Sequence, residues 1–219
     1  MAPDSDSRTA ILDAGELLFA ERGFAATTIK HIGTEAGVNS ALLYYYFADK
    51  ERLYAAVLQR VLDTLMLEGE RVFAAAKSPE DAIRGLIGVQ GELLTSRPHV
   101  ARLMAREFVD HQAAHVSGKL VQLAAGIFRR LCEMIRDGQR DGTLGSDFDA
   151  QFAAISTIAQ VIYFHIARPA VGILLGHGSD GPPEPVARAY TAHAAEFAVA
   201  ALKPPSKRRA NRPAGKRKP

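Results

Sequence analysis

Side chains able to contact nucleic acid gather in the segment 40–46, which reads SALLYYY. Leu43 and Phe47 lie four residues apart, so a helix here would turn both toward one apolar side. The side chains that point away from that side belong to Ser40, Leu42, Tyr44 and Tyr45. A serine hydroxyl can bond to a base edge and an apolar group can pack on a thymine methyl, while tyrosine hydroxyls suit phosphate oxygens. The pattern predicts contact with DNA, and packing of the tyrosines inside the protein is the alternative.

Two short helices are expected to position this segment. Thr28 is suited to cap the first helix, because its hydroxyl can accept a hydrogen bond from an amide of the first turn. Gly37 supplies the left-handed residue that ends that helix, and Asn39 caps the second one. The apolar side of the first helix is formed by Ile29, Ile32 and Ala36. Two short helices joined by a glycine-containing turn form a helix-turn-helix, whose second helix can enter the major groove of DNA.

The first quarter of the chain resembles the DNA-binding domain of the TetR family of transcriptional regulators. The residues that carry the resemblance occur in the family's order and without a gap: Gly23-Phe24, Thr27-Thr28-Ile29, Ile32, Ala36-Gly37-Val38, Leu43-Tyr44, Tyr46-Phe47, Lys50-Glu51 and Leu53. Three positions depart from the usual pattern. Gly33 stands where alanine is common, Asn39 replaces serine, and Ala41 replaces a frequent glycine. A glycine inside a helix costs about 1 kcal/mol relative to alanine, and none of the three changes alters the expected fold.

By this resemblance, two sets of residues are expected to hold DNA. Those in position to reach bases are Ser40, Ala41, Leu42 and Tyr45. Those in position to hold phosphates are Thr28, Tyr44, Tyr46 and Lys50. Thr28 and Lys50 each open a helix, where unpaired amides also attract an anion, and a solvated charge is the alternative for Lys50. The resemblance further implies a homodimer on a double-stranded DNA operator, a small-molecule effector that releases it, and pairing of the last two long helices between protomers.

The rest of the chain reads as helices only, because apolar residues recur at helical spacing and no alternating strand pattern is found. The expected helices run over about 7–22, 50–77, 78–96, 98–108, 117–141, 147–166 and 184–202. A kink at Pro169 would let the helix at 147–166 continue to Leu175. We expect an all-α protein with a helix-turn-helix domain at 1–54, a larger helical domain for effector binding and dimerisation at 55–202, and a disordered basic tail at 203–219.

The charges are unevenly distributed along the chain. The segment 203–219 holds eight lysines and arginines and no acidic residue, whereas residues 1–55 hold five basic and eight acidic side chains. The high isoelectric point therefore comes from the tail, and the prediction of DNA binding rests on the motif rather than on charge. A basic segment without helical pattern can meet phosphates but cannot hold a register against bases, so we expect it to raise affinity for DNA of any sequence. A solubilising or dispensable end is the alternative.

Apolar and aromatic side chains of the larger domain favour an apolar or amphipathic effector, because small-molecule pockets are mostly apolar with a few polar anchors. The candidate lining residues are Met104, Phe108, Phe128, Phe152, Tyr163 and His165. His165 and Arg168 lie within an apolar helix, where unpaired polar groups are costly. A neighbouring helix could satisfy them, or they could line the cavity. The helices at 152–164 and 186–201 carry more apolar surface than one core needs, which favours a dimer interface.

Few residues support any other chemistry. His111 and His115 are four apart, but no HExxH motif or cysteine pair accompanies them, so no metal site is predicted. No nucleophile–base arrangement, glycine-rich phosphate loop or carboxylate pair is found, so neither an enzyme nor a cofactor is expected. The single Cys132, the lack of an apolar run of membrane length and the lack of a signal core favour a cytoplasmic protein without membrane contact. The alternative function is a helical interaction protein that no longer reads a specific operator, which the acidic N-terminal segment keeps open.

Overall fold

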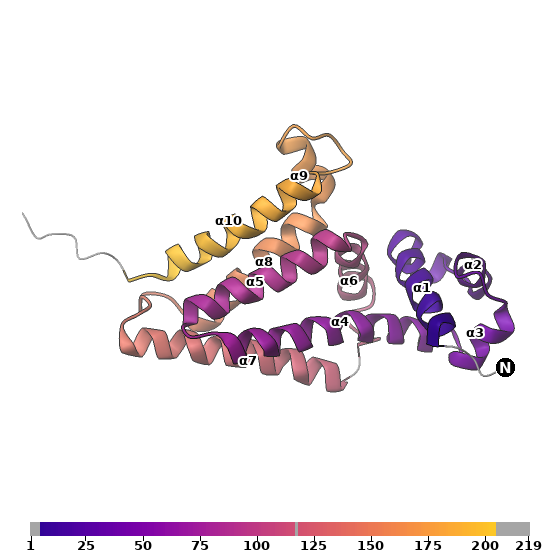
Figure 1. The fold of residues 1–219 in the computed structure, drawn as a ribbon, viewed down its shortest axis with the longest axis horizontal. Helices are drawn as coiled ribbons and strands as arrows, with labels where there is room; N and C mark the ends of the chain where they lie inside the picture. Colours follow the sequence, from indigo (N-terminus) through magenta and orange to yellow (C-terminus); the bar gives the residue numbers. More distant parts are fainter. Residues whose placement is uncertain (1–4, 117, 205–219) are drawn as a thin grey trace, which may run out of the picture.

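The computed structural model describes residues 5–116 and 118–204, and over these ranges every regular element is a helix. Figure 1 shows a small head at the N-terminal end and a longer body, with one long helix running from one into the other. The prediction of an all-α protein is confirmed. Residues 1–4 and most of the predicted basic tail, 205–219, lie outside the described ranges.

The head is built from α1 (Ser5–Ala26), α2 (Ile29–Glu35), α3 (Ser40–Tyr46) and the first turns of α4 (Lys50–Ala75). Three side chains begin α2, α3 and α4 as N-caps, because each accepts a hydrogen bond from the amide three residues ahead: Thr28, Asn39 and Asp49. Gly23 breaks the helical backbone of α1 near its end with a φ of 79°, and Gly37 follows α2 with a φ of 67°. Local side-chain chemistry therefore sets the boundaries of the helix-turn-helix, as the sequence predicts.

The tight turn between α2 and α3 explains the glycine at position 33. A Cβ atom on Gly33 would lie 2.9 Å from the carbonyl oxygen of Val38 and 3.2 Å from Cδ1 of Leu43. The amide of Val38 donates to the carbonyl of Gly33 at 2.9 Å, which keeps the two chain segments close. The departure from the family's usual alanine thus accommodates a close approach of the two helices, and this approach fixes the direction of α3.

The head has its own core, and α1 supports the helix-turn-helix from behind. Its largest fully buried side chains include Phe19, Ile32, Leu43 and Tyr54. Each such side chain contributes roughly 1.5–3 kcal/mol relative to an exposed position. Leu103 of α6 (His99–Asp110) also belongs to this core. The head is therefore packed against the body through α6 as well as connected to it through α4.

The body consists of the rest of α4 with α5 (Pro79–Ser96), α6, α7 (Gly118–Asp141), α8 (Ala150–Ile166), α9 (Arg168–Leu174) and α10 (Glu184–Leu202). α5 lies at its centre and packs against α4, α8 and α10, while α7 packs on α4 and α8. Along α4, Leu58 still belongs to the core of the head and Val61 already belongs to the core of the body. The cores change inside α4, a few residues after the predicted boundary at 54, and the exact boundary stays a prediction.

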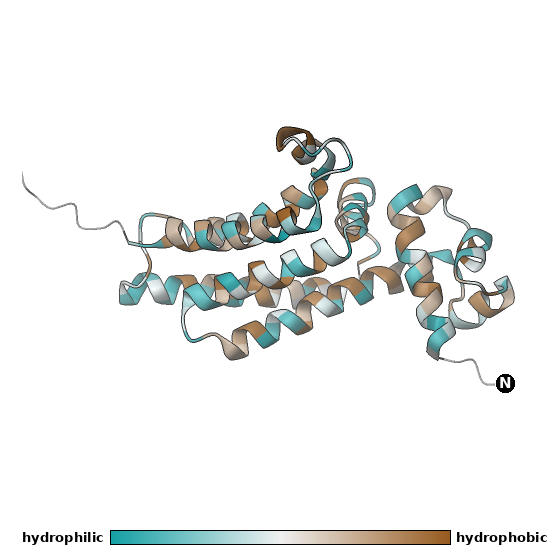
Figure 2. Ribbon diagram, turned by 45° about the horizontal axis from the view of Figure 1, so that its top comes forward, coloured by the Kyte–Doolittle hydropathy of each residue, from teal (hydrophilic) through white to brown (hydrophobic). Residues whose placement is uncertain are grey.

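α8 and α9 form separate helices, bent by 82° at the break between them. The sequence suggests one helix that continues past a kink at Pro169, whereas the structure has two helices with a sharp bend between them. α8 is apolar on several sides, so burying one side leaves Phe152 and Tyr163 exposed to 72% and 68%. Figure 2 shows α9 in brown at the outer end of the body, where Leu174 is 82% exposed. Among the described residues no single helix is long and apolar enough to cross a membrane, and the bent α8–α9 pair passes on length and composition alone.

Candidate DNA-binding surface and effector cavity

The outer side of α3 carries the residues expected to reach bases. Leu43 is fully buried and Phe47 nearly so, which turns the opposite side of the helix outward. The residues exposed on that side are Ser40, Ala41, Tyr44 and Tyr45, with Leu42 half-buried. Tyr45 exposes 68% of its surface and no buried group covers it. An exposed helix face with hydroxyl and aromatic groups has the chemistry to bind in a major groove.

The residues expected to hold phosphates are placed less uniformly. Thr28 is exposed, and its hydroxyl accepts a hydrogen bond from the amide of His31 at 3.2 Å. Tyr46 is half-buried, and its ring meets the ring of Tyr45 edge-on at a centroid distance of 5.3 Å. Their contacts with DNA stay predictions.

Lys50 is bound within the head. Its Nζ donates to the carbonyl oxygens of Phe24 at 2.9 Å and Thr27 at 3.1 Å, and it lies 4.3 Å from the centre of the Phe24 ring. These contacts fasten the start of α4 to the connection between α1 and α2. The sequence does not reveal this role, because the partners lie far apart along the chain. A phosphate contact by Lys50 stays a prediction, and it would have to compete with these internal hydrogen bonds.

A buried carboxylate, that of Glu16, joins the head to the body. It accepts hydrogen bonds from Arg60 Nη2 at 2.9 Å and Arg97 Nε at 3.0 Å, and His99 Nε2 lies 2.6 Å from it. Burial by itself raises the pKa of Glu16, but the hydrogen bonds from His99, Arg97 and Arg60 outweigh burial and lower the pKa to about 2. We call these four residues the Glu16 cluster.

The Glu16 cluster spans four helices. Glu16 belongs to α1, Arg60 to α4, Arg97 is the C-cap of α5, and His99 opens α6. Sequence reasoning missed it, because a charged residue inside an amphipathic helix looks like an ordinary surface residue. Its one available signal was Glu16 itself, which stands among apolar residues of the first helix. The cluster therefore ties α1 to α4, to the end of α5 and to the start of α6.

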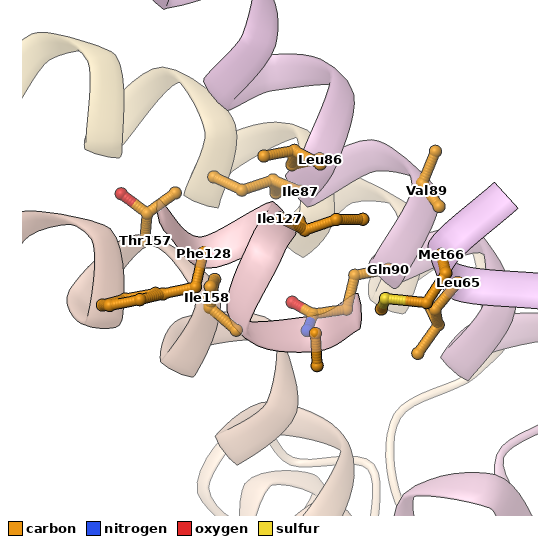
Figure 3. Close-up of a pocket in the computed structure, with 11 residues that line it drawn as sticks. Leu65, Met66, Leu86, Ile87, Val89, Gln90, Ile127, Phe128, Thr157 and Ile158 are labelled. Atoms are coloured by element: carbon orange, nitrogen blue, oxygen red, sulfur yellow. The ribbon is translucent and has the colours of Figure 1, made fainter. Parts of the chain in front are cut away.

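The body encloses a cavity of about 220 Å³ between α4, α5, α7 and α8 (Figure 3). Its lining is almost wholly apolar and comprises Leu65, Met66, Leu86, Ile87, Val89, Gln90, Ala124, Ile127, Phe128, Thr157 and Ile158. Two polar side chains belong to it. Gln90 places its amide among the apolar groups, and the hydroxyl of Thr157 donates to the carbonyl oxygen of Ala153 at 2.9 Å. An apolar cavity with few polar groups suits a small apolar or amphipathic ligand.

Of the residues expected to line an effector pocket, Phe128 lies in this cavity. Phe108 and Phe152 are 57% and 72% exposed and lie on the surface. Tyr163 lines an open groove along α8, which meets the cavity at Phe128 and Ile158. Met104 packs where the two cores meet. Of the predicted set, Phe128 is thus the residue that lines this cavity, and contact of the others with an effector stays a prediction. Aromatic side chains chosen by type do not show which side of a helix faces inward.

His165 of α8 is buried, with 4% of its surface exposed, and does not line the cavity. Neither ring nitrogen has a hydrogen-bond partner among the described residues. Burial lowers the pKa of His165 to about 4, and the charge of Arg168 lowers it in the same direction. The neutral imidazole is thus the form that fits the fold, and a neighbouring helix does not satisfy it as one sequence-based alternative supposed.

Two family models match the chain over these two parts. The model described as bacterial regulatory proteins, tetR family, covers residues 11–57, and the model described as tetracyclin repressor-like, C-terminal domain, covers residues 79–195. The chain belongs to the TetR family. It is a DNA-binding transcriptional repressor regulated by a small-molecule effector. The family is one of regulators and not of enzymes, and the alternative of an interaction protein that no longer reads an operator is not favoured.

Relatives with a curated function agree with this assignment. The HTH-type transcriptional repressor KstR2 of Rhodococcus jostii is 30% identical over 150 residues, which cover 68% of this chain and 73% of that protein. The repressor NicS of Pseudomonas putida is 29% identical over 161 residues, covering 73% and 75%. Both matches extend well beyond the head. The family assignment therefore does not depend on the helix-turn-helix alone.

Solved structures share the whole fold. KstR2 of Mycobacterium tuberculosis, described as a ketosteroid transcriptional regulator, superposes with a TM-score of 0.69 at 19% identity and covers 93% of this chain and 98% of its own. A TetR family regulator from Marinobacter aquaeolei gives 0.69 at 21% identity, covering 92% and 98%. FadR of Bacillus subtilis in complex with stearoyl-CoA gives 0.64 at 16% identity, covering 89% and 99%. At these identities the likeness concerns the fold.

Proposed function

We propose that two copies of this chain bind an operator through α3 and release it when an apolar or amphipathic effector fills the body cavity. The observation that carries the proposal is the cavity, which is lined by α4 and α5, the helices that also hold the Glu16 cluster. Of two neighbours in fold, one is described as a ketosteroid transcriptional regulator and the other is in complex with stearoyl-CoA. A steroid is mainly apolar, and stearoyl-CoA is amphipathic, with a long apolar acyl chain on a charged nucleotide. They support an effector of this general chemistry without naming it.

The route from cavity to head follows from the shared helices. Leu65 and Met66 line the cavity about one and a half turns beyond Arg60 on α4, and Gln90 lies about two turns before Arg97 at the end of α5. A ligand larger than the cavity must push these walls apart or open the contact between Phe128 and Ile158 toward the groove along α8. Because packed helices move as rigid bodies, the displacement reaches Glu16 and turns α1. The turn changes the distance between the two recognition helices of a dimer.

The dimer is proposed because one helix-turn-helix buries too little surface for tight specific binding, while two half-sites on one duplex provide it. The apolar side chains left exposed on α8 and α10 include Phe152, Ile155, Tyr163 and Phe197. They favour pairing of these two helices between protomers, which is also the arrangement that the family resemblance implies. Because the proposed target is an operator on DNA in the cytoplasm, we propose that the protein is located there.

The proposal is tested with purified protein and labelled duplexes covering the DNA upstream of its own gene. We expect one duplex to bind specifically, a panel of hydrophobic compounds to raise the melting temperature, and the compounds that do so to weaken that duplex. Ile127→Phe fills the cavity and should abolish the thermal shift, whereas Val121→Phe, exposed on the same helix, should keep it. Sedimentation of a monomer at micromolar concentration, or compounds that bind without changing DNA affinity, would contradict the proposal.

A further inference from the structure

Three potential metal ligands converge where α6 ends. They are Glu107 in the last turn of α6, His111 directly after the helix, and His115 in the following turn. One ligand atom from each residue lies within 4.8 Å of the others. The rings of His111 and His115 meet edge-on at a centroid distance of 4.8 Å. The glutamate is fully buried and the two histidines are half-buried.

The turn after α6 brings the three residues together. A spacing of four would place them along one helix face, but α6 ends at Asp110. Gln112 and Ala113 then take left-handed backbone angles, with φ of 51° and 62°, and the amide of Ala113 donates to the carbonyl of Glu107 at 3.1 Å. The chain doubles back, so His115 returns over the end of the helix. The sequence shows the spacing of the histidines but does not show this return, which is why Glu107 was not counted with them.

The carboxylate of Glu107 holds His115 at two points. One oxygen accepts a hydrogen bond from the backbone amide of His115 at 2.8 Å, and the other lies 3.1 Å from its ring Nδ1. Among the described residues, His115 is the only ion-pair partner of Glu107. A fully buried carboxylate is costly unless a cation compensates it.

We propose that Glu107, His111 and His115 form a binding site for a divalent transition-metal ion of the zinc class. Two imidazoles and one carboxylate are a ligand set that zinc accepts, with water in the fourth position. Tetrahedral bonds of about 2.0–2.2 Å place ligand atoms roughly 3.4 Å apart. The pair of His115 Nδ1 and Glu107 Oε2 already lies at 3.1 Å. The three ligand atoms lie within 4.8 Å of one another, so the half-buried His111 ring has to move its ligand nitrogen closer to complete the set. Nδ1 of His115 must carry no proton when it binds an ion, so the neutral ring would carry its proton on Nε2.

A purely structural role explains only part of the cluster. The contacts between Glu107 and His115 are enough to hold the turn in place. Burial, and after it the charge and hydrogen bond of Glu107, raise the pKa of the neighbouring Tyr54. The side chain of His111 takes part in neither hydrogen bond between Glu107 and His115. Its ring contacts the rings of Phe24, Tyr54 and His115. A metal ion bound by all three residues would explain why the His111 ring lies beside the buried carboxylate of Glu107 and the imidazole of His115.

The site lies against the head. The ring of His115 is 5.4 Å from that of Phe24 at the end of α1 and 5.0 Å from that of Tyr54 on α4. An ion that draws the two imidazoles onto Glu107 therefore fixes the end of α6 relative to both helices. Metal would act as a second input to operator binding, separate from the effector cavity. This consequence, unlike the binding itself, rests on the proposed function.

The binding is tested with full-length chain, without a histidine tag and freed of metal by chelation. Cobalt(II) serves as the probe, because its visible absorption reports tetrahedral coordination, and zinc then competes for the same site. We expect one saturable cobalt per chain, displaced by zinc. His111→Ala should weaken cobalt binding at least tenfold, while His177→Ala, an exposed histidine elsewhere, should leave it unchanged. Equal cobalt affinity in His111→Ala and the wild type, or no saturable binding, would overturn the proposal.

Two further measurements separate a lost site from a lost fold. His111→Ala keeps both hydrogen bonds between Glu107 and His115 and loses only ring contacts of a half-buried side chain, so its melting temperature without metal should fall slightly below that of the wild type. Zinc should raise the melting temperature of the wild type and of His177→Ala but not that of His111→Ala, or of His111→Gln if the alanine variant is unstable. A metal-dependent rise in His111→Ala or His111→Gln equal to that of the wild type would also count against the site.

Operator binding is measured last, with and without zinc. We expect zinc to change operator affinity in the wild type and to leave it unchanged in His111→Ala. If no duplex binds at all, the repressor function fails while the cobalt result still decides the site. If cobalt does not bind, the site fails while operator binding still decides the repressor function.

Discussion

The head and the body are built from the same kind of element but differ in how far apart their determinants lie in the sequence. In the head, caps at Thr28, Asn39 and Asp49 and the turn at Gly37 set α2 and α3 within about twenty residues. In the body, the cavity is lined by residues from 65 to 158 on four helices. The comparison teaches that the part which reads DNA is locally specified, whereas the part which senses a ligand exists only after long-range packing.

Removing a core side chain of the head should break the comparison most strongly. Leu43→Ala deletes a fully buried side chain between α2 and α3, and we expect a loss of roughly 2–5 kcal/mol of stability confined to the head. Hydrogen exchange should speed up in α2 and α3 while α5 and α8 stay protected. Leu67→Ala, at an exposed position of α4, is the control and should change little. Equal loss of protection in both parts would mean that they unfold as one unit.

The body should lose stability at milder acidity than the head–body contact. Burial lowers the pKa of His165 to about 4, from an ordinary value near 6.5, so its contribution is complete above pH 6.5 and is lost as the pH falls toward 4. This amounts to roughly 3 kcal/mol. His165→Leu should remove the dependence, and denaturant melts between pH 7 and 4 measure it. His193→Leu, an exposed histidine of α10, should retain the wild-type slope.

The Glu16 cluster should respond at stronger acidity. The pKa of Glu16 is lowered to about 2 in the fold, so its contribution is complete above about pH 4.5 and is lost as the pH falls toward 2. Glu16→Gln should cost roughly 2–3 kcal/mol near neutral pH and flatten that acid limb. Asp13→Asn removes an exposed carboxylate that pairs, among the residues the structure describes, with Arg60, and it should cost less than about 1 kcal/mol. A neutral effect of Glu16→Gln would mean that the cluster does not hold the head.

The surface of α3 should show the smallest free-energy change and the most specific one. Tyr45→Ala removes an exposed side chain whose ring meets that of Tyr46 at the surface and is not part of the core of the head, so the fold should be little affected. We expect operator binding to weaken by roughly 1–3 kcal/mol and binding to random duplex to stay nearly unchanged. Anisotropy titrations with both duplexes at one salt concentration measure this. Equal weakening on both duplexes would indicate that Tyr45 touches only phosphates.

The same contrast explains what could be predicted from the sequence. Helical spacing and caps predict all helices of the head and most of the body, and the exposure of Tyr44 and Tyr45 follows from the positions of Leu43 and Phe47. Lys50 shows the limit inside the head, because its partners Phe24 and Thr27 become neighbours only when α1 and α4 cross. Periodicity gives the type of a helix but does not give its rotation toward a partner.

The lining of the cavity could accordingly not be predicted from the sequence. Phe108 and Phe152 are apolar and lie on amphipathic or apolar helices, yet both face outward, while the smaller Ile127 and Ile158 line the cavity. Side-chain type cannot distinguish a residue that lines a cavity from one that lines an interface. Nothing in the sequence indicates that Gln90 lines the cavity, because an isolated amide side chain on a helix usually faces solvent. Glu16 and Glu107 were hidden for the same reason, since their burial depends on helices far away in the chain.

The central claim is that ligand in the body and DNA on the head are linked through the Glu16 cluster. Its most direct test is the reciprocal coupling, measured as operator affinity with and without a bound hydrophobic effector and as effector affinity with and without operator. Linkage requires the two factors to be equal, and we expect about 5- to 150-fold in the wild type. Glu16→Gln should reduce both factors together while leaving effector affinity in the absence of DNA unchanged. An undiminished coupling factor in Glu16→Gln would contradict the account.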